Sequence, residues 1–296
     1  MRSKNTGAHK ALETVIHLIF LLCGIVAVGF VLIISVYLII SGLPAIREIG
    51  LFKFLFGQVW DPTNTTGAQY GILPFILTSI YGTAGAMVIG VPIGLMTAIF
   101  LAKLAPAPVA AVIRTAVQLL AGIPSVVYGL VGMIVLVPLI RTTFSLGSGA
   151  CLLAAILVLS IMVLPSIINV SETALRAVPR EYEEASLALG ATELETYFRV
   201  SVPAAKSGIA AAVVLGVGRA IGEAMAILMV AGNVANMPSL LSSVKFLTTA
   251  IASEMSYAAV GSLQRNALYS IGLILFLFIM CINVILNVFL KRNKEG

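Results

Sequence analysis

The sequence predicts an all-α, polytopic membrane protein with six transmembrane helices. Hydrophobic residues make up 60% of its 296 residues, and charged residues make up only 10%. The mean hydropathy is +1.09, which excludes an ordinary soluble globular domain. Apolar runs long enough to cross about 30 Å of hydrocarbon recur along the chain, and we expect each of them to form one span.

These runs divide the chain into two short tails, six spans and the segments that join them. The first run, 15–40, is 26 residues long and follows a basic tail, but it lacks a convincing cleavage site. We therefore interpret it as an uncleaved span rather than a signal peptide. A polar and aromatic segment, 41–70, is expected on the far side of the membrane, before a transmembrane core at 71–290. The expected spans are residues 15–40, 71–101, 115–140, 149–170, 207–231 and 268–290, between tails at 1–14 and 291–296.

Three features within these segments suggest how the helices pack. The span 71–101 carries glycines that would let helix backbones approach closely in lipid, and these are Gly82, Gly85, Gly90 and Gly94. Pro124 interrupts the span 115–140 and predicts a kink or break, which is tolerated only where the backbone packs in protein or lines a cavity. Trp60 and the phenylalanines near it are typical of an interfacial aromatic belt.

The distribution of Lys and Arg predicts which ends of the spans face the cytoplasm. Twelve of the 18 basic residues fall at the termini, near Lys103 or in the loop 171–206, five fall on the opposite side, and Arg219 lies inside a span. Because cytoplasmic segments carry the excess of positive charge, we expect both termini and this loop to be cytoplasmic. The net charge of +6 therefore indicates membrane orientation rather than binding to nucleic acid.

The loop 171–206 is the longest polar interval of the chain and contains six of its twelve acidic residues. A proline before Arg180 and a glycine at position 190 predict the start and the end of a short helix. Thr192 and Glu195 form a capping-box pattern that predicts the start of a second helix, and we expect Pro203 to end it. Two short helices joined at a glycine would make a compact knob outside the bilayer.

The same loop carries a spaced motif. Glu184-Ala185-Ser186 is followed after three residues by Gly190, and after nine more by Val-Ser-Val-Pro, which ends at Pro203. This pattern resembles the EAA loop of binding-protein-dependent ABC importer permeases, although the family has alanine where Ser186 stands and Ile-x-Leu before the proline. The resemblance implies an ABC importer permease (MetI-like) fold with a cytoplasmic coupling helix, in which these five residues contact an ATPase. An ordinary solvated loop is the alternative, and the fixed offsets argue against it.

The sequence offers no sign of catalysis by this chain itself. It has no G-x4-G-K-[ST] phosphate loop, so hydrolysis of ATP would have to take place on a partner. His9 and His17 do not have the spacing of a metalloenzyme, and the three cysteines form neither a disulfide framework nor a metal pattern. We therefore expect no cofactor and no enzymatic activity in this subunit.

Two charged residues, Arg219 and Glu223, stand inside the expected span 207–231. A charge at the bilayer centre costs about 2.5–3.5 kcal/mol on insertion scales. Because the two are four residues apart, we expect them on one helical face, where they can neutralise each other, while Gly218 and Gly222 let a neighbouring helix approach. Either the pair only fixes helix packing, or Arg219 offers its planar guanidinium to a passing oxyanion and Glu223 holds it in place.

Four segments together resemble the PstC-type permease of phosphate ABC importers, over nearly the whole chain. They are Trp-Asp-Pro at 60–62, Gly-Ile-Leu-Pro at 71–74, Gly-Ile-Pro-Ser-Val-Val-Tyr-Gly-Leu at 122–130 and Gly-Arg-Ala-Ile-Gly-Glu at 218–223. The resemblance implies a bacterial inner-membrane subunit that forms half of a phosphate pathway, with Arg219 and Glu223 in that pathway. The implied partners are a second (PstA-type) permease, a dimer of (PstB-type) ATP-binding subunits and an extracytoplasmic (PstS-type) phosphate-binding protein, with lipid around the spans.

Three other functions remain open from the sequence. An importer permease for another oxyanion, such as molybdate, tungstate or sulfate, would differ in substrate competition. A self-energised secondary carrier would transport without an ATPase, and the polar knob argues against it. A membrane scaffold or sensor without flux would survive deletion of the ATPase, whereas transport would stop.

Overall fold

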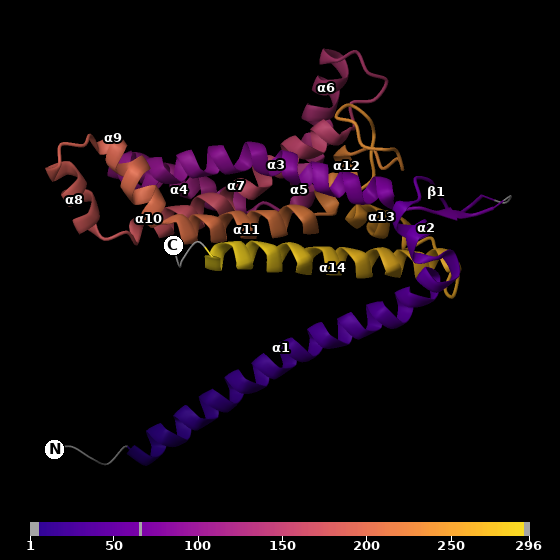
Figure 1. The fold of residues 1–296 in the computed structure, drawn as a ribbon, viewed down its shortest axis with the longest axis horizontal. Coiled ribbons are helices and arrows are strands. Elements are labelled where there is room, and N and C mark those ends of the chain that lie inside the picture. The colour runs from indigo at the N-terminus through magenta and orange to yellow at the C-terminus, as the bar shows by residue number, and fades with distance from the viewer. Residues whose placement is uncertain (1–5, 65–66, 293–296) are drawn as a thin grey trace.

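Four long apolar helices run side by side and form the body of the molecule (Figure 1). They are α3 (Leu73–Ile99), α7 (Leu152–Arg176), α11 (Lys206–Gly222) and α14 (Leu263–Arg292). The structure is a computed structural model that describes residues 6–64 and 67–292, with side chains for 12–64 and 67–285. The tail residues Arg2, Lys4 and Lys294, which entered the charge count, lie outside the described residues.

Helix α7 forms the centre of this body, and α3 packs closely along it. A Cβ atom added at Gly85, Gly90 or Gly94 would come within 2.7 Å of an α7 side chain. The glycines of α3 therefore set the spacing of these two helices, as the sequence predicted, because only a residue without a side chain allows this approach.

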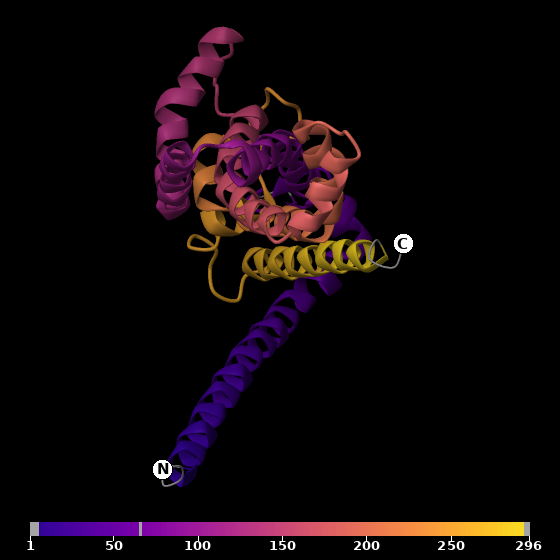
Figure 2. The same cartoon turned by 90° about the vertical axis from the view of Figure 1, so that its left-hand side faces the viewer.

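Helix α1 (Thr6–Ile49) contacts the body only through its C-terminal part and then leaves it (Figures 1 and 2). Gly42 lies against the backbone of α14, and the hydroxyl of Ser270 donates a hydrogen bond of 2.6 Å to the Gly42 carbonyl. Closer to the N-terminus the apolar side chains of α1 are exposed in this chain. Such a surface requires lipid or another subunit to cover it.

One end of the body, which we call the hairpin end, is built from four short elements (Figure 1). They are α2 (Leu51–Phe56), the antiparallel pair of β1 (Trp60–Asp61) and β2 (Gln69–Tyr70), and α13 (Leu247–Glu254). The segment between α12 (Met225–Val230) and α13 covers the same end. These elements share one hydrophobic core with the C-terminal part of α1 and with the first part of α14.

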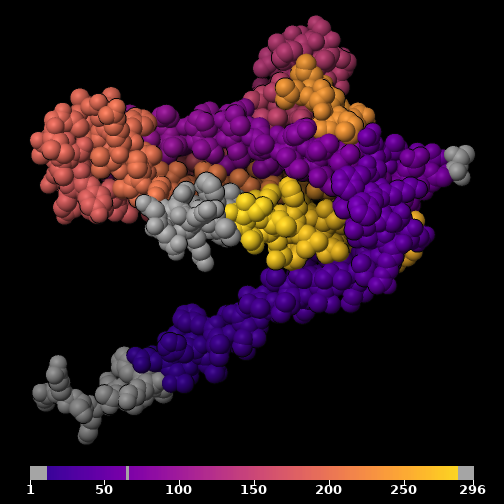
Figure 3. Space-filling view, in the orientation of Figure 1, coloured from indigo at the N-terminus to yellow at the C-terminus, as the bar shows by residue number. Residues whose placement is uncertain are grey.

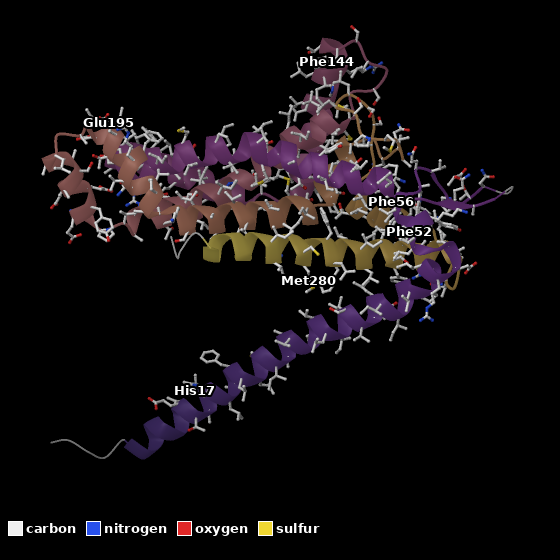
Figure 4. The ribbon with its side chains drawn as sticks, viewed as in Figure 1. His17, Phe52, Phe56, Phe144, Glu195 and Met280 are labelled. Atoms are coloured by element: carbon white, nitrogen blue, oxygen red, sulfur yellow. The ribbon has the colours of Figure 1, made fainter. Side chains whose placement is uncertain are left out.

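The tryptophan of this end is part of the core rather than of an aromatic belt, so that expectation was wrong. Trp60 is only 7% exposed, and its indole N–H donates to the carboxylate of Glu254 at 2.9 Å. A buried indole needs such an acceptor. Glu254 also pairs with Lys245 at 2.5 Å. Phe52 and Phe56 are exposed on α2, where their rings stack (Figure 4).

Pro124 breaks its helix, as predicted, but the break separates two segments instead of bending one span at 115–140. Helix α4 (Ala107–Gly122) ends before Ile123 and Pro124, and the chain continues as α5 (Ser125–Val131), the π-helical turn η2 (Gly132–Leu136) and α6 (Val137–Thr143). The second segment leaves the bundle, so that α6 projects from one side (Figures 1 and 2). The residue before a proline avoids helical geometry, and Ile123 is extended.

The span expected at 207–231 is also broken, which the sequence did not predict. Helix α11 ends at Gly222, Glu223 is extended with φ −73° and ψ 128°, and α12 follows. Helix α12 packs on α5, where a Cβ atom at Gly129 would lie 2.8 Å from the Cα atom of Ala226. The short second halves of the two broken helices therefore support each other.

The described helices agree with a polytopic membrane protein. Five of them are long and apolar enough to cross a bilayer, and the number rises to six when the pair on either side of Ala205 is taken as one bent span. Among the described residues the only strands are the two-residue β1 and β2. The predicted all-α class is therefore confirmed.

Candidate functional site

A small polar domain projects from the end of the body opposite the hairpin end (Figures 1 and 3). We call it the knob, and it consists of α8 (Arg180–Ala188), α9 (Glu193–Thr196), the π-helical turn η3 (Tyr197–Ser201) and α10 (Val202–Ala204). Pro179 precedes α8, and Gly190 adopts φ +88°, a left-handed conformation that favours glycine. The capping box is complete: the Glu195 N–H donates to the Thr192 hydroxyl, and the Thr192 N–H donates to the Glu195 carboxylate. The predicted helix boundaries at Gly190 and Thr192 are confirmed.

The second helical run of the knob, Glu193–Ala204, ends one residue after Pro203, which agrees with the prediction. Pro203 lies in α10, directly after η3. The helical path then bends by 71° at Ala205, before α11. Pro203 therefore lies just before the hinge between the knob and the body.

The residues of the spaced motif differ in exposure. Glu184 and Ala185 are exposed on α8, whereas Ser186 is half-buried and its hydroxyl shares a hydrogen bond of 2.9 Å with that of Thr196. Helix α8 buries none of its residues. The knob also exposes large apolar side chains, which are Tyr182, Leu187, Leu189, Leu194 and Phe198. Exposed apolar groups on an otherwise polar knob indicate a surface for another protein.

Two acidic residues of the loop point inward instead, and the sequence analysis did not single them out. Glu183 pairs with Lys103, and Glu172 pairs with Arg114 and Arg176. The i,i+4 spacing of Glu172 and Arg176 was available as a signal. The partners from other helices were not, because the sequence does not show which loops meet.

Outside the membrane spans, Glu195 has a perturbed carboxyl group. Hydrogen bonds from the backbone and the hydroxyl of Thr192, together with the nearby charge of Arg199, lower the pKa of Glu195 below its ordinary value. The carboxylate is therefore the form that stabilises the start of α9. It lies on the outer face of the knob (Figure 4).

Inside the body, Arg219 lies in the last turn of α11 and is half-buried. Its one hydrogen bond among the described residues is a long one of 3.5 Å, from Nη1 to the hydroxyl of Ser166 on α7. A guanidinium has five N–H donors. Most of them are therefore free of protein acceptors in the described part of the chain.

The expected ion pair between Arg219 and Glu223 is absent from the described residues. The helix stops at Gly222, so Glu223 does not lie one turn above Arg219. Its carboxylate accepts a hydrogen bond of 3.1 Å from the backbone N–H of Ala226, at the start of α12. Its backbone carbonyl accepts one of 2.8 Å from the hydroxyl of Thr248 on α13. Glu223 thus holds the break, and Arg219 has no carboxylate partner among the described residues.

The glycines beside Arg219 line an open face. A Cβ atom added at Gly218 or Gly222 would meet no atom of the described chain within 4 Å. The neighbouring helix that the sequence predicted against these glycines is therefore not supplied by the described residues. Among those residues, no group of three or more His, Cys, Asp or Glu side chains could hold a metal ion; His17 lies exposed on α1 (Figure 4).

Comparison with known proteins identifies the family. Residues 90–295 match the family described as "Binding-protein-dependent transport system inner membrane component". The chain belongs to this permease family. The permease is 40% identical over 267 residues to "Probable ABC transporter permease protein YqgH" of Bacillus subtilis, covering 88% of this chain and 86% of that one. It is 36% identical over 284 residues to "Phosphate transport system permease protein PstC" of Haemophilus influenzae, covering 88% of each chain.

Solved structures support the same fold for the permease. A chain from the inward-facing MetNI methionine ABC transporter superposes with a TM-score of 0.57 and is 20% identical, covering 75% of this permease and 94% of that chain. This likeness shows the fold alone. The predicted ABC importer permease fold is confirmed, and the subunit is a transport permease rather than an enzyme.

Proposed function

We propose that this permease forms half of the pathway of an ATP-driven importer of inorganic phosphate. The names of the PstC relatives support phosphate as the substrate. The proposal rests mainly on the surroundings of Arg219. Its guanidinium lies in a membrane helix and has no carboxylate partner among the described residues, and the glycines beside it line an open face. Its planar fork matches the oxygens of phosphate.

The open face beside Arg219 supports a second, PstA-type permease as the other half of the pathway. A helix of that subunit packed against Gly218 and Gly222 would enclose Arg219 between the two halves. Glu223 would act at the same place by holding the break between α11 and α12. Its carboxylate bonds to α12 and its carbonyl to α13, so the guanidinium stays available for an anion.

The knob supports coupling to a dimer of PstB-type ATP-binding subunits. Helix α8 has no buried residue and presents Glu184 and Ala185 outward. In this proposal α8 sits in a groove of one ATPase subunit. Ser186 holds α8 against Thr196, Gly190 forms the turn after α8, and Pro203 lies just before the hinge at Ala205. Closure of the ATPase pair on ATP would push α8, and the helices would rock between inward and outward openings.

The charges and the shape support one orientation in the membrane. The positive-charge distribution supports cytoplasmic tails and a cytoplasmic knob. The described ends of α1 and α14 point toward the knob end of the molecule (Figure 1), which supports the same orientation. The hairpin end would then face outward, and its segments 41–70 and 232–267 would receive the PstS-type phosphate-binding protein.

Transport by the purified complex in liposomes tests this function. With the ATPase, the second permease and the binding protein present, labelled phosphate should accumulate only when ATP is supplied, and unlabelled phosphate should compete. Competition by molybdate, tungstate or sulfate with little competition by phosphate would assign another oxyanion. Uptake without the ATPase would indicate a secondary carrier, and an assembled complex without flux would indicate a scaffold.

A further inference from the structure

A π-helical turn joins the knob to the membrane helices. This turn is η1 (Phe100–Leu104), which continues α3 at the end of the body nearest the knob. One side of η1 bonds to the knob through Lys103. The other side bonds to α4 and α7 through the carbonyl of Leu101.

The Leu101 carbonyl is open because of the local sequence. The N–H of Ala105 bonds to Phe100 at 2.7 Å, and the next residue, Pro106, has no N–H to give. Two guanidinium groups take the vacant acceptor, Arg114 from α4 at 3.3 Å and Arg176 from α7 at 3.0 Å. The C-terminal end of a helix also favours cations, so this end of the α3–η1 helix is held by charges from two neighbouring helices.

A single carboxylate fixes both arginines. The same oxygen of Glu172 accepts from Nε of Arg114 at 2.7 Å and from Nε of Arg176 at 2.9 Å. The Glu172 side chain is only 8% exposed. Without the Glu172 carboxylate, the two guanidinium groups would lose the negative charge that compensates them. Glu172 therefore sets the position of both arginines on η1.

On the knob side, Glu183 of α8 makes the corresponding contact. Its carboxylate pairs with Lys103 at 2.5 Å and accepts a hydrogen bond of 2.7 Å from Ser201 at the end of η3. Lys103 and Glu183 are 12% and 17% exposed, so water screens this pair far less than an exposed one. The motif residue Glu184 is its exposed neighbour, and Glu183 faces the body.

We propose that η1 is the junction through which movement of α8 reaches α4 and α7, and that Glu183 and Glu172 are the positioning residues that hold it. When α8 moves, the ion pair of Glu183 with Lys103 moves η1 with it. The hydrogen bonds of Arg114 and Arg176 to the Leu101 carbonyl then transmit this movement to α4 and α7. This inference rests on the proposed function, because it assigns the route by which ATP closure would move the helices.

The test uses the complete complex and two readouts. The first is phosphate taken up per ATP hydrolysed in proteoliposomes. Glu183→Gln keeps an acceptor for Ser201 but removes the negative charge that pairs with Lys103. It should lower this ratio about fivefold or more, the usual scale of coupling between sites. Lys103→Gln should do the same, and the exchange of both charges, K103E with E183K, should restore much of the ratio. Arg141→Gln, which removes an exposed cation from α6, is the matched control and should leave the ratio unchanged.

The second readout is hydrogen exchange of η1 and α4 with and without a non-hydrolysable ATP analogue, which does not depend on the substrate. In the wild type the analogue should change exchange in α8, η1 and α4 together, and in Glu183→Gln the change should stop at α8. For the other side of the junction, Arg114→Lys keeps a charge beside Glu172 but loses the fork, and it should confine the change to α8 and η1.

The outcomes separate the two proposals. If the wild-type complex does not take up phosphate, the proposed function fails, and the exchange data still decide the junction. Wild-type coupling in both single variants, or an unaltered exchange response of α4 in Glu183→Gln, would overturn the junction. Loss of coupling that the charge exchange restores supports it.

Discussion

The knob and the interior of the body each contain a helix that stops and restarts, at Gly190 and at Glu223. In the knob, the signals are local: a left-handed glycine ends α8, and a reciprocal capping box starts α9. In the interior, Glu223 is extended without a proline or a left-handed glycine, and contacts from α12 and α13 hold it there.

The difference has a physical cause. Helix ends in water can be satisfied by nearby side chains and by solvent. In a membrane interior no water replaces a lost partner, so a break exists only where other helices satisfy the backbone. We therefore expect changes at the interior break to destabilise the protein more than changes at the knob.

The largest effect on stability is expected at the contact between α5 and α12. Gly129→Ala would place a Cβ atom 2.8 Å from the Ala226 Cα atom and 3.0 Å from its carbonyl oxygen. Because the neighbour is backbone, the cost should reach about 3 kcal/mol, the upper part of the overpacking range. Thermal unfolding of the complex in detergent measures it. The matched control is Gly147→Ala, where a Cβ atom has no neighbour within 4 Å, and equal melting temperatures for the two variants would contradict the account.

A smaller effect is expected at Glu223. Glu223→Ala removes the charged acceptor for the Ala226 N–H, a bond worth roughly 1.5 kcal/mol. Hydrogen exchange should rise in α12 and remain unchanged in the first turns of α11. Glu223→Gln keeps an acceptor for the Ala226 N–H, so its exchange in α12 should lie between that of the wild type and that of Glu223→Ala. Unchanged exchange of α12 in Glu223→Ala would show that the break is held elsewhere.

The smallest effect is expected at the capping box of the knob. Thr192→Ala should cost about 1 kcal/mol of local stability, because it removes the hydroxyl that caps α9. The pKa of Glu195 is lowered in the folded knob. A group of this kind contributes stability above its unfolded-state pKa and loses it as the pH falls through its folded-state pKa. The protection of the backbone amides at the start of α9 against hydrogen exchange should therefore fall at acid pH. In Thr192→Ala this loss of protection should begin at a higher pH. The same onset in both proteins would contradict this reading.

The same contrast explains how much could be predicted from the sequence. The apolar runs, the break at Pro124 and the ends of the knob helices depend on neighbouring residues, and the sequence indicated each of them. The glycines of α3 were also identified, because their spacing follows one helix.

The features that were missed depend on residues distant in sequence. Trp60 is buried in a core built from distant segments, and Glu254, 194 residues away, accepts the hydrogen bond of its indole. Arg219 and Glu223 do not pair because α13 and α12 hold the chain extended at Glu223. The positions of Glu172 and Glu183 depend on which helices meet at η1, and a pattern along one chain does not show this.

Phosphate uptake by variants of Arg219 shows whether its guanidinium binds the anion on its way through the membrane. In proteoliposomes containing the complete complex, Arg219→Ala should reduce ATP-dependent uptake of labelled phosphate to background while the complex still assembles, and Arg219→Lys should retain only part of it, because a lysine keeps the charge but lacks the planar fork. Uptake at the wild-type rate by an assembled Arg219→Ala complex would contradict the claim that this guanidinium binds the passing anion.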